Sequence, residues 1–168
     1  HLGGGTTGPF DLGGWTEFRG ILGGGVASYT NWDKTENGVT TPNVTTYTTT
    51  DQVNEAVTFI DAQTTDPWFV WMGFNAPHTP FHNPPITPTL LEDYPEYVET
   101  DGVVTGTDRR GAYEAALQAL DTEIGRLLDS VDLDTTNIII IGDNGTPGAV
   151  AQAPFDSSHA KGTLYDGG

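Results

Sequence analysis

The sequence predicts an α/β fold with a mainly parallel, mixed sheet flanked by helices. Two observations carry this prediction. Helical periodicity runs over residues 51–61 and 108–131, and a short, continuously apolar run follows each helix, at residues 68–74 and 137–141. An apolar run without alternation is typical of a strand buried on both faces. Strands that alternate with helices favour parallel pairing, so we expect a sheet covered by helices.

The first predicted helix has an apolar face formed by Val53, Val57 and Ile60 at positions i, i+4 and i+7. Thr50 or Asp51 is the expected capping residue at its start. The second helix has the clearest period in the chain. Its predicted apolar stripe steps by threes and fours through Tyr113, Leu117, Leu120, Ile124, Leu127, Leu128 and Val131.

The first fifty residues are rich in Gly and Thr and show little periodicity, which is typical of loops and turns. Two short apolar pieces, residues 18–22 and 26–29, are candidate strands. Residues 45–50 are β-prone and polar, and we expect them to form an exposed strand or a linker.

Composition excludes several functional classes. The chain has 168 residues, about one domain, with 6 basic and 23 acidic side chains and a net charge of −17. Nucleic acid is not an expected partner, because no basic patch can release counterions from phosphates. Cysteine is absent, which excludes disulfides and thiolate metal sites within these residues. No apolar run approaches the roughly 18 residues of a membrane span.

Candidate functional residues follow both predicted strands. His78 lies in a proline-rich segment, residues 75–107, after the first strand, and Asp143 and Asn144 end the second. In parallel sheets ligands bind beyond the carboxyl ends of the strands, so these residues are expected at one rim. Asp143 and Asn144 offer oxygen ligands suited to Ca²⁺ or Mg²⁺. Asp-Asn-Gly is also good turn chemistry, and taken alone the turn is favoured.

Each remaining candidate has a structural alternative. His78 stands between two prolines, and an imidazole can donate a proton to a leaving group, but a loop histidine can equally bind backbone carbonyls. A metal pair with His82 would need a helix, which the prolines disfavour. Lys161 is one of only two lysines and adjoins a glycine, so it could approach an anion closely. The alternative for Lys161 is a solvated surface side chain.

Five blocks of the sequence resemble the sulfatases, of the arylsulfatase type, in the alkaline phosphatase superfamily. Each block is modest alone, and the five occur in the family's order, which makes the match fairly specific. The blocks are His1-Leu-Gly, residues 69–81 (FVWMGFNAPHTPF), residues 113–128 (YEAALQALDTEIGRLL), residues 138–145 (IIIIGDNG) and residues 161–168 (KGTLYDGG).

The resemblance implies an alkaline-phosphatase-like fold and the hydrolysis of sulfate esters. It implies that Asp143 and Asn144 bind a divalent cation, usually Ca²⁺ in this family, with Mg²⁺ as the alternative. His78 would contact the ester and help protonate the leaving oxygen, and Lys161 would bind a sulfate oxygen. His1 would lie beside the nucleophile, which in this family is a formylglycine made from the first residue of a C/S-x-P-x-R motif.

That motif and the family's paired N-terminal aspartates do not occur in residues 1–168. We therefore interpret residues 1–168 as an internal portion of a sulfatase catalytic domain. The N-terminal nucleophile and metal segment and the C-terminal subdomain would lie outside it. The sheet would then be incomplete, and we expect the portion alone to be inactive. The resemblance favours a periplasmic or secreted bacterial enzyme acting on small-molecule or saccharide sulfate esters.

Two other functions stay open at this point. A phosphodiesterase or phosphonate hydrolase of the same superfamily would use similar metal and histidine chemistry. A non-catalytic, acidic cation-binding module could retain the fold without an anion pocket. Neither substrate identity nor oligomeric state can be predicted from the sequence.

Overall fold

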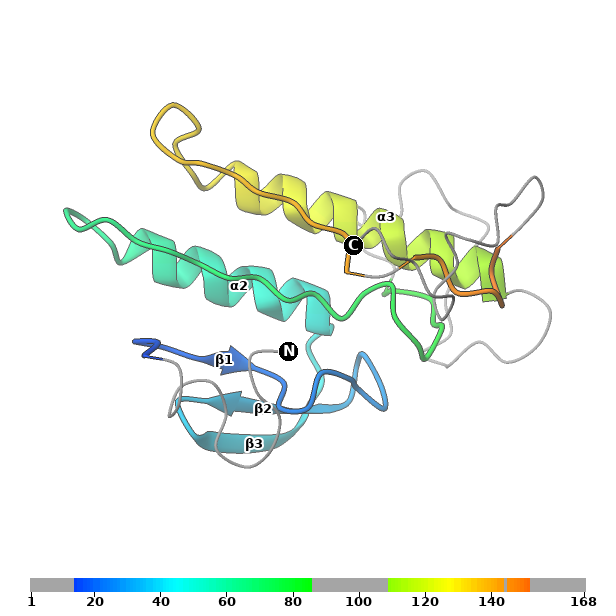
Figure 1. The fold of residues 1–168 in the computed structure, drawn as a ribbon. Helices are drawn as coiled ribbons and strands as arrows, with labels where there is room; N and C mark the ends of the chain where they lie inside the picture. Colours follow the sequence, from blue (N-terminus) through cyan, green and yellow to red (C-terminus); the bar gives the residue numbers. More distant parts are fainter. Residues whose placement is uncertain (1–13, 86–108, 144, 152–168) are drawn as a thin grey trace.

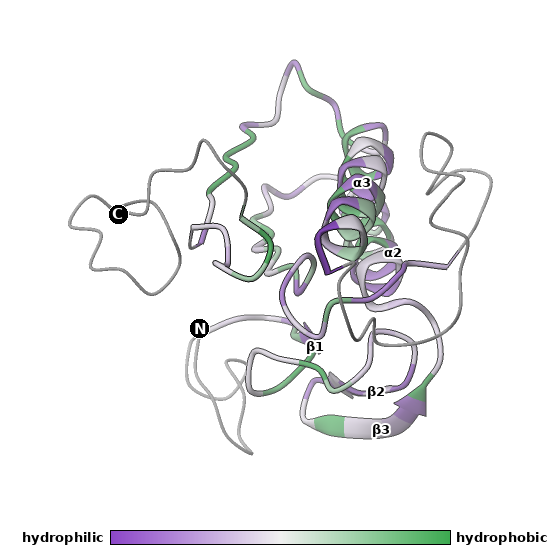
Figure 2. Cartoon of the chain, turned by 90° about the vertical axis from the view of Figure 1, so that its right-hand side faces the viewer, coloured by the Kyte–Doolittle hydropathy of each residue, from purple (hydrophilic) through white to green (hydrophobic). Residues whose placement is uncertain are grey.

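The computed structural model describes residues 14–85, 109–143 and 145–151. Within these ranges three short strands precede two helices, and Figure 1 shows the sheet on one side of α2 and α3 on the other. Figure 2 shows the same stacking from a second direction. The elements are β1 (Arg19–Gly20), β2 (Trp32–Glu36), β3 (Val39–Val44), α2 (Thr48–Asp61) and α3 (Arg109–Leu128).

The sheet within the described residues is antiparallel, with strand order β1-β2-β3. The prediction of helices with a sheet is confirmed, but the predicted parallel pairing is not found in this part of the chain. The reason is local: Asn37 and Gly38 adopt positive φ angles of 48° and 89° and close a tight hairpin between β2 and β3. Asn-Gly is a strong hairpin signal, which our sequence prediction missed.

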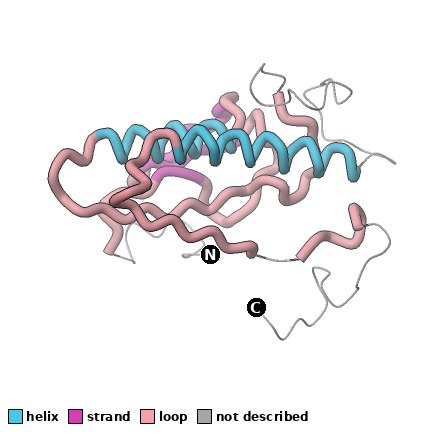
Figure 3. Tube along the Cα trace, turned by 90° about the horizontal axis from the view of Figure 1, so that it is seen from above, coloured by secondary structure: helices cyan, strands magenta, loops and turns pink. Residues whose placement is uncertain are grey.

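The two apolar runs predicted as buried strands are extended but belong to no strand. Residues 68–74 run back along α2 and residues 137–141 run back along α3, on the same side of the helix pair and in the same direction (Figures 1 and 3). Phe69 is 68% exposed and Ile139 is 80% exposed. The prediction of burial on both faces is therefore wrong for the described chain, because no described strand pairs with either run.

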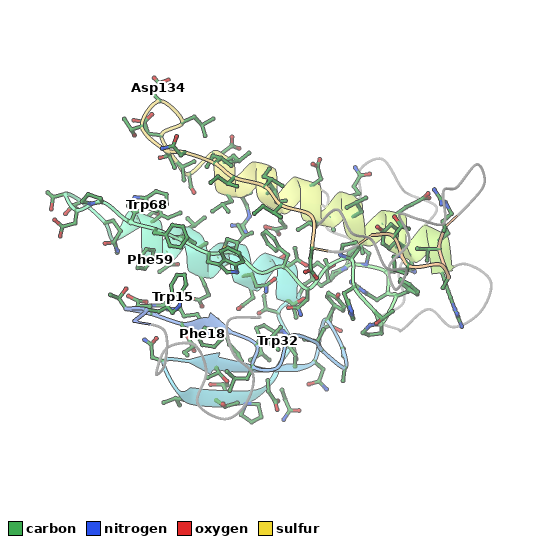
Figure 4. The ribbon with its side chains drawn as sticks, in the orientation of Figure 1. Trp15, Phe18, Trp32, Phe59, Trp68 and Asp134 are labelled. Carbon is green, nitrogen blue, oxygen red and sulfur yellow. The ribbon has the colours of Figure 1, made fainter. Side chains whose placement is uncertain are left out.

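The predictions for the N-terminal segments are confirmed in part. β1 lies within residues 18–22, but residues 26–29 form no strand. Residues 45–50 are not an exposed strand, since Thr48 to Thr50 form the first turn of α2. Figure 4 shows Trp15 and Phe18, which precede β1 in the sequence, on the side of α2 that faces the sheet. Trp15 packs against Phe69, with ring centroids 5.7 Å apart.

Helix α2 confirms the first helical prediction, and its buried face agrees in part, since Val57 of the predicted face is half-buried. Val53, Ala56 and Ile60 are buried, with the spacing of one helical stripe. The predicted cap is wrong, because the helix begins at Thr48 with Tyr47 as its N-cap residue and without a side-chain cap hydrogen bond. Asp51 instead lies in the first turn, where a carboxylate is favourable to the helix dipole.

Helix α3 confirms the second helical prediction, but it buries a different face. The predicted stripe of large apolar side chains is only partly buried, and Leu117 is 45% exposed. The buried face consists mainly of small residues: Gly111, Ala112, Ala115, Ala116, Ala119 and Glu123. Small side chains let neighbouring segments approach the helix closely, and Ala119 packs with Tyr29, Tyr47 and Ala76.

A buried ion cluster joins the sheet to α2. The Lys34 ammonium lies 2.9 Å from the Asp51 carboxylate and also pairs with Glu55, which accepts a hydrogen bond from Arg19 at 2.5 Å. Burial alone would lower the Lys34 pKa, but the hydrogen bonds to Glu55 and Asp51 outweigh it, so the pKa is raised. Lys34 therefore stays charged, and its ammonium forms ion pairs within its own chain.

A second polar cluster joins α2 to α3. The Thr50 hydroxyl donates to Glu123 Oε1 at 2.6 Å, and Arg126 donates to Glu123 Oε2 at 2.8 Å. Glu123 is 4% exposed, so these bonds satisfy a carboxylate that burial would otherwise penalise. The two bonds fix the start of α2 against the C-terminal part of α3. Ala76 packs nearby, against Ala119 of α3.

Candidate functional site

Of the predicted site residues, the structure describes His78 and Asp143. His1, Asn144 and Lys161 lie outside the described residues, so their proposed roles stay predictions. His78 lies in the loop that follows extended residues 68–74, and Asp143 lies at the end of extended residues 137–143. The two extended segments run in the same direction (Figure 1), and in the sequence each candidate comes at or just after the C-terminal end of its segment.

His78 is the last residue of a turn that begins at Asn75. The His78 amide donates to the Asn75 carbonyl at 2.8 Å. The hydroxyl of Tyr29 lies 2.8 Å from the Asn75 carbonyl and 2.8 Å from the His78 carbonyl. Tyr29 is 2% exposed, and burial raises the pKa of its phenol, so the hydroxyl keeps its proton and can donate. The turn is thus held from its buried side.

Side-chain amides hold the other end of this turn. Gln52 on α2 donates to the Gly73 carbonyl at 3.1 Å and to Asn75 Oδ1 at 3.3 Å. Asn75 Nδ2 in turn donates to the Gly24 carbonyl at 3.3 Å. Three distant parts of the chain therefore meet at Asn75, which is buried, and they fix where the turn leaves the extended segment.

The His78 imidazole itself is exposed. Its Nδ1 lies 2.9 Å from the Thr79 carbonyl oxygen, which can only accept, so the ring donates its Nδ1 proton there. The Thr79 hydroxyl lies 3.3 Å from the same nitrogen. The hydrogen bond to the Thr79 carbonyl selects the Nδ1-protonated tautomer and leaves Nε2 as the nitrogen available to a ligand. The arrangement suits a histidine that exchanges a proton with a bound ligand.

His82 has a structural role and does not pair with His78 at a metal. It is 5% exposed, and its ring stacks on Tyr29 with centroids 3.7 Å apart. Its Nδ1 donates to the Pro80 carbonyl at 3.1 Å, and Tyr47 donates its hydroxyl proton to Nε2 at 2.9 Å. Burial lowers the pKa of His82 to about 4, and the bond to Pro80 offsets this only in part. Both ring nitrogens of the neutral side chain are satisfied.

The loop after His78 and the segment after Asp143 pack together. Phe81 and Val150 are buried in one cluster with Ala112 of α3. Arg110 of α3 donates to the Val150 carbonyl at 2.9 Å. The loops that follow the two extended segments therefore contact one another, although these segments are not sheet strands. A shared site of His78 and Asp143 at one rim stays a prediction.

The oxygen-donor chemistry at residue 143 suits Ca²⁺ or Mg²⁺. Asp143 is exposed, as a ligand accessible to a cation must be. Across residues 14–85, 109–143 and 145–151, however, no group of three or more His, Asp or Glu side chains is placed to hold a metal ion. One carboxylate cannot fill a shell of about six to eight oxygens, so any cation here needs donors from outside these ranges.

Sequence reasoning missed the residues that hold the His78 turn. Tyr29 and Gln52 lie 49 and 26 residues before it, in segments without functional motifs. Buried tyrosine hydroxyls usually find a hydrogen-bond partner, but that rule does not name the partner. The signal available in the sequence was the presence of aromatic residues in an otherwise Gly- and Thr-rich region.

Comparison with known proteins covers almost the whole chain. The family model described as Sulfatase matches residues 5–166, a range that includes His78, Asp143 and Lys161. No curated protein matches the chain. Within the described residues, neither helix is long and apolar enough to cross a membrane.

Proposed function

The chain belongs to the sulfatase family, and from that premise we propose that it contributes His78 as the proton donor in the hydrolysis of sulfuric esters. The observation that carries this proposal is the exposed imidazole of His78, held on a turn that three other segments anchor. A general acid must be fixed within hydrogen-bond reach of the atom that it protonates, and this turn provides that fixation.

The proposed step at His78 follows from its tautomer. The proposed donor is the ring protonated on both nitrogens: the Nδ1 proton stays on the ring, hydrogen-bonded to the Thr79 carbonyl, and the Nε2 proton passes to the ester oxygen as the sulfur–oxygen bond breaks. The alcohol then leaves neutral, while the imidazole is left as an acceptor at Nε2. Protonating an alkoxide leaving group is worth typically about 10²–10⁴-fold in rate.

The other residues of the proposed site lie partly outside the described chain. Asp143 and Asn144 are the proposed ligands of a divalent cation, with Ca²⁺ favoured, and that cation would offset negative charge on the sulfate group. Lys161 is proposed to bind a sulfate oxygen and His1 to lie beside the nucleophile. A formylglycine encoded upstream of His1 is the proposed nucleophile. We further propose a saccharide or small-molecule ester as substrate and a periplasmic or secreted location.

The proposal is tested by hydrolysis of 4-nitrophenyl sulfate and phenyl sulfate by the complete natural protein, expressed with a formylglycine-generating enzyme. We expect His78→Ala to lower kcat for phenyl sulfate by about 10²-fold or more, because the phenoxide must then leave unprotonated. Asn54→Ala, an exposed substitution on α2, is the matched control and should retain wild-type activity.

Three outcomes contradict the proposal. Hydrolysis of phosphodiesters or phosphonates in preference to sulfates would assign the chain to phosphoryl chemistry. Absence of any ester hydrolysis, with cation binding retained, would indicate a binding module. Undiminished activity of His78→Ala would remove His78 from the reaction.

A further inference from the structure

The hydroxyl of Tyr29 lies beneath the backbone that carries His78. It lies 2.8 Å from two carbonyl oxygens, those of Asn75 and His78, and carries a single proton to donate. The Asn75 carbonyl also accepts the His78 amide, so it keeps a partner without Tyr29. The His78 carbonyl belongs to the residue that carries the imidazole. Of the two bonds, the one to His78 therefore constrains the backbone at the proposed acid itself.

The Tyr29 ring is held as firmly as its hydroxyl. It stacks on His82 with an interplanar angle of 18°, and it packs with Tyr47, Ala76 and Ala119. His82 binds the Pro80 carbonyl, two residues beyond His78. The Tyr29 backbone carbonyl accepts the amide of Thr48 at the start of α2. Tyr29 is thus held against the helix pair, and its hydroxyl contacts the His78 loop from that fixed position.

From this geometry we infer that Tyr29 is a positioning residue for His78: its hydroxyl fixes the Asn75–His78 turn so that the imidazole stays aligned with the leaving oxygen. The inference rests on the proposed role of His78. Tyr29 does not touch the substrate in this assignment, since it is buried and acts through the backbone of the turn. Displacing a catalytic group by about 1 Å can cost about 10²-fold in rate, so a backbone anchor at this position has a kinetic effect.

The leaving-group dependence of hydrolysis is the readout. Proton donation matters most for esters of weakly acidic alcohols and least for 4-nitrophenyl sulfate, whose phenolate leaves readily. In the complete natural protein we expect Tyr29→Phe to lower kcat for phenyl sulfate by about tenfold and kcat for 4-nitrophenyl sulfate by less than about threefold. KM should change little, because the substitution removes no contact to the ester.

Tyr47→Phe is the matched control. It removes a hydroxyl from the same aromatic cluster, but one that binds His82 Nε2 and not the turn. We expect it to change both substrates equally, whatever its effect on the melting temperature. The imidazole ¹⁵N signals of His78, assigned by their loss in His78→Ala, should shift in Tyr29→Phe and stay unchanged in Tyr47→Phe. This second readout does not depend on turnover.

A double variant separates positioning from general stability. If Tyr29 acts through His78, Tyr29→Phe adds no further loss to kcat in the His78→Ala background. Equal losses on both substrates, or multiplicative losses in the double variant, overturn the inference. Should Tyr29→Phe not fold, 3-fluorotyrosine at position 29 retains the hydroxyl and alters its hydrogen-bond strength. An unchanged ratio of the two substrates would then overturn the inference as well.

The two proposals fail in different ways. If the wild-type protein hydrolyses no sulfate ester, or His78→Ala keeps full activity, the proposed function fails and the role of Tyr29 fails with it. If His78→Ala shows the leaving-group-dependent loss and Tyr29→Phe does not, the proposed function stands and the positioning role alone is wrong.

Discussion

Two histidines four residues apart in one loop have opposite environments. His78 is exposed and forms a hydrogen bond to the backbone through one ring nitrogen. His82 is buried, and both of its ring nitrogens form hydrogen bonds. The sequence identified His78 as a candidate from its flanking prolines. It could not assign His82, because the partners Tyr47 and Tyr29 come from segments that only the folded chain brings near.

The burial of neutral His82 predicts a pH dependence of stability. Its pKa is about 4 in the folded protein, below the ordinary value of 6.5, so between these values the unfolded chain binds the proton and the folded chain does not. The contribution of His82 to the free energy of unfolding should be fully present above pH 6.5. It should fall toward pH 4, by up to about 3 kcal/mol. Denaturant unfolding at several pH values measures the effect.

His82→Gln is the control for this pH dependence, since Gln keeps a polar side chain without a titrating group. The difference in unfolding free energy between the two proteins should shrink steadily from pH 6.5 to pH 4. A difference that is constant across this range would show that His82 does not stay neutral in the folded protein.

At the scale of elements, the sequence predicted both helices and missed the hairpin. The helical periods of residues 51–61 and 108–131 are local patterns, and α2 and α3 match them within a few residues. The face that the sequence predicted α3 to bury was wrong, because the space that Ala119 fills is set by Tyr29 and Tyr47 packed against it and not by the helical period. The missed hairpin had a recognisable turn, Asn37-Gly38.

The hairpin turn predicts the cost of adding a side chain at Gly38. A methyl group there would meet no neighbouring atom within 4 Å, so the penalty comes from the backbone, whose φ is +89°. We expect Gly38→Ala to lower the free energy of unfolding by about 1–2 kcal/mol, as measured by urea unfolding. Gly25→Ala is the matched control, with open space and no positive φ. Equal effects of both substitutions would contradict this explanation.

At the scale of the whole molecule, the main discrepancy concerns residues 68–74 and 137–141. Their β-favouring, continuously apolar composition predicted buried strands, and the structure keeps them extended and in one direction without pairing them. Burial of a strand is a property of what lies on each side of it, which the local sequence does not contain. Of the candidate site, the sequence singled out His78, whose imidazole is exposed and whose role stays a proposal, but not the residues that anchor its turn.

The exposure of these two runs predicts self-association of the 168-residue chain when it is prepared alone. Ile139, Ile140 and Ile141 are 72–80% exposed, and apolar patches of this kind bind dyes and other chains. We expect the double variant Ile139→Thr/Ile141→Thr to bind less of an apolar fluorescent dye and to scatter less light. Val39→Thr changes a single exposed side chain, 71% exposed on β3, and should leave both signals unchanged. Dye binding equal to that of the wild-type chain would contradict this prediction.

The ion pairs that stabilise the fold also affect how an anion approaches the molecule in solution. Arg19, Lys34, Arg110 and Arg126 all pair with carboxylates of their own chain, so their charges are neutralised close to the surface. At longer range the field of a chain with net charge −17 repels a sulfate ester. Dissolved salt shortens the reach of that field from about 30 Å at 0.01 M to about 8 Å at 0.15 M. Capture of the substrate should therefore become faster as ionic strength rises, the reverse of enzymes that attract their substrates electrostatically.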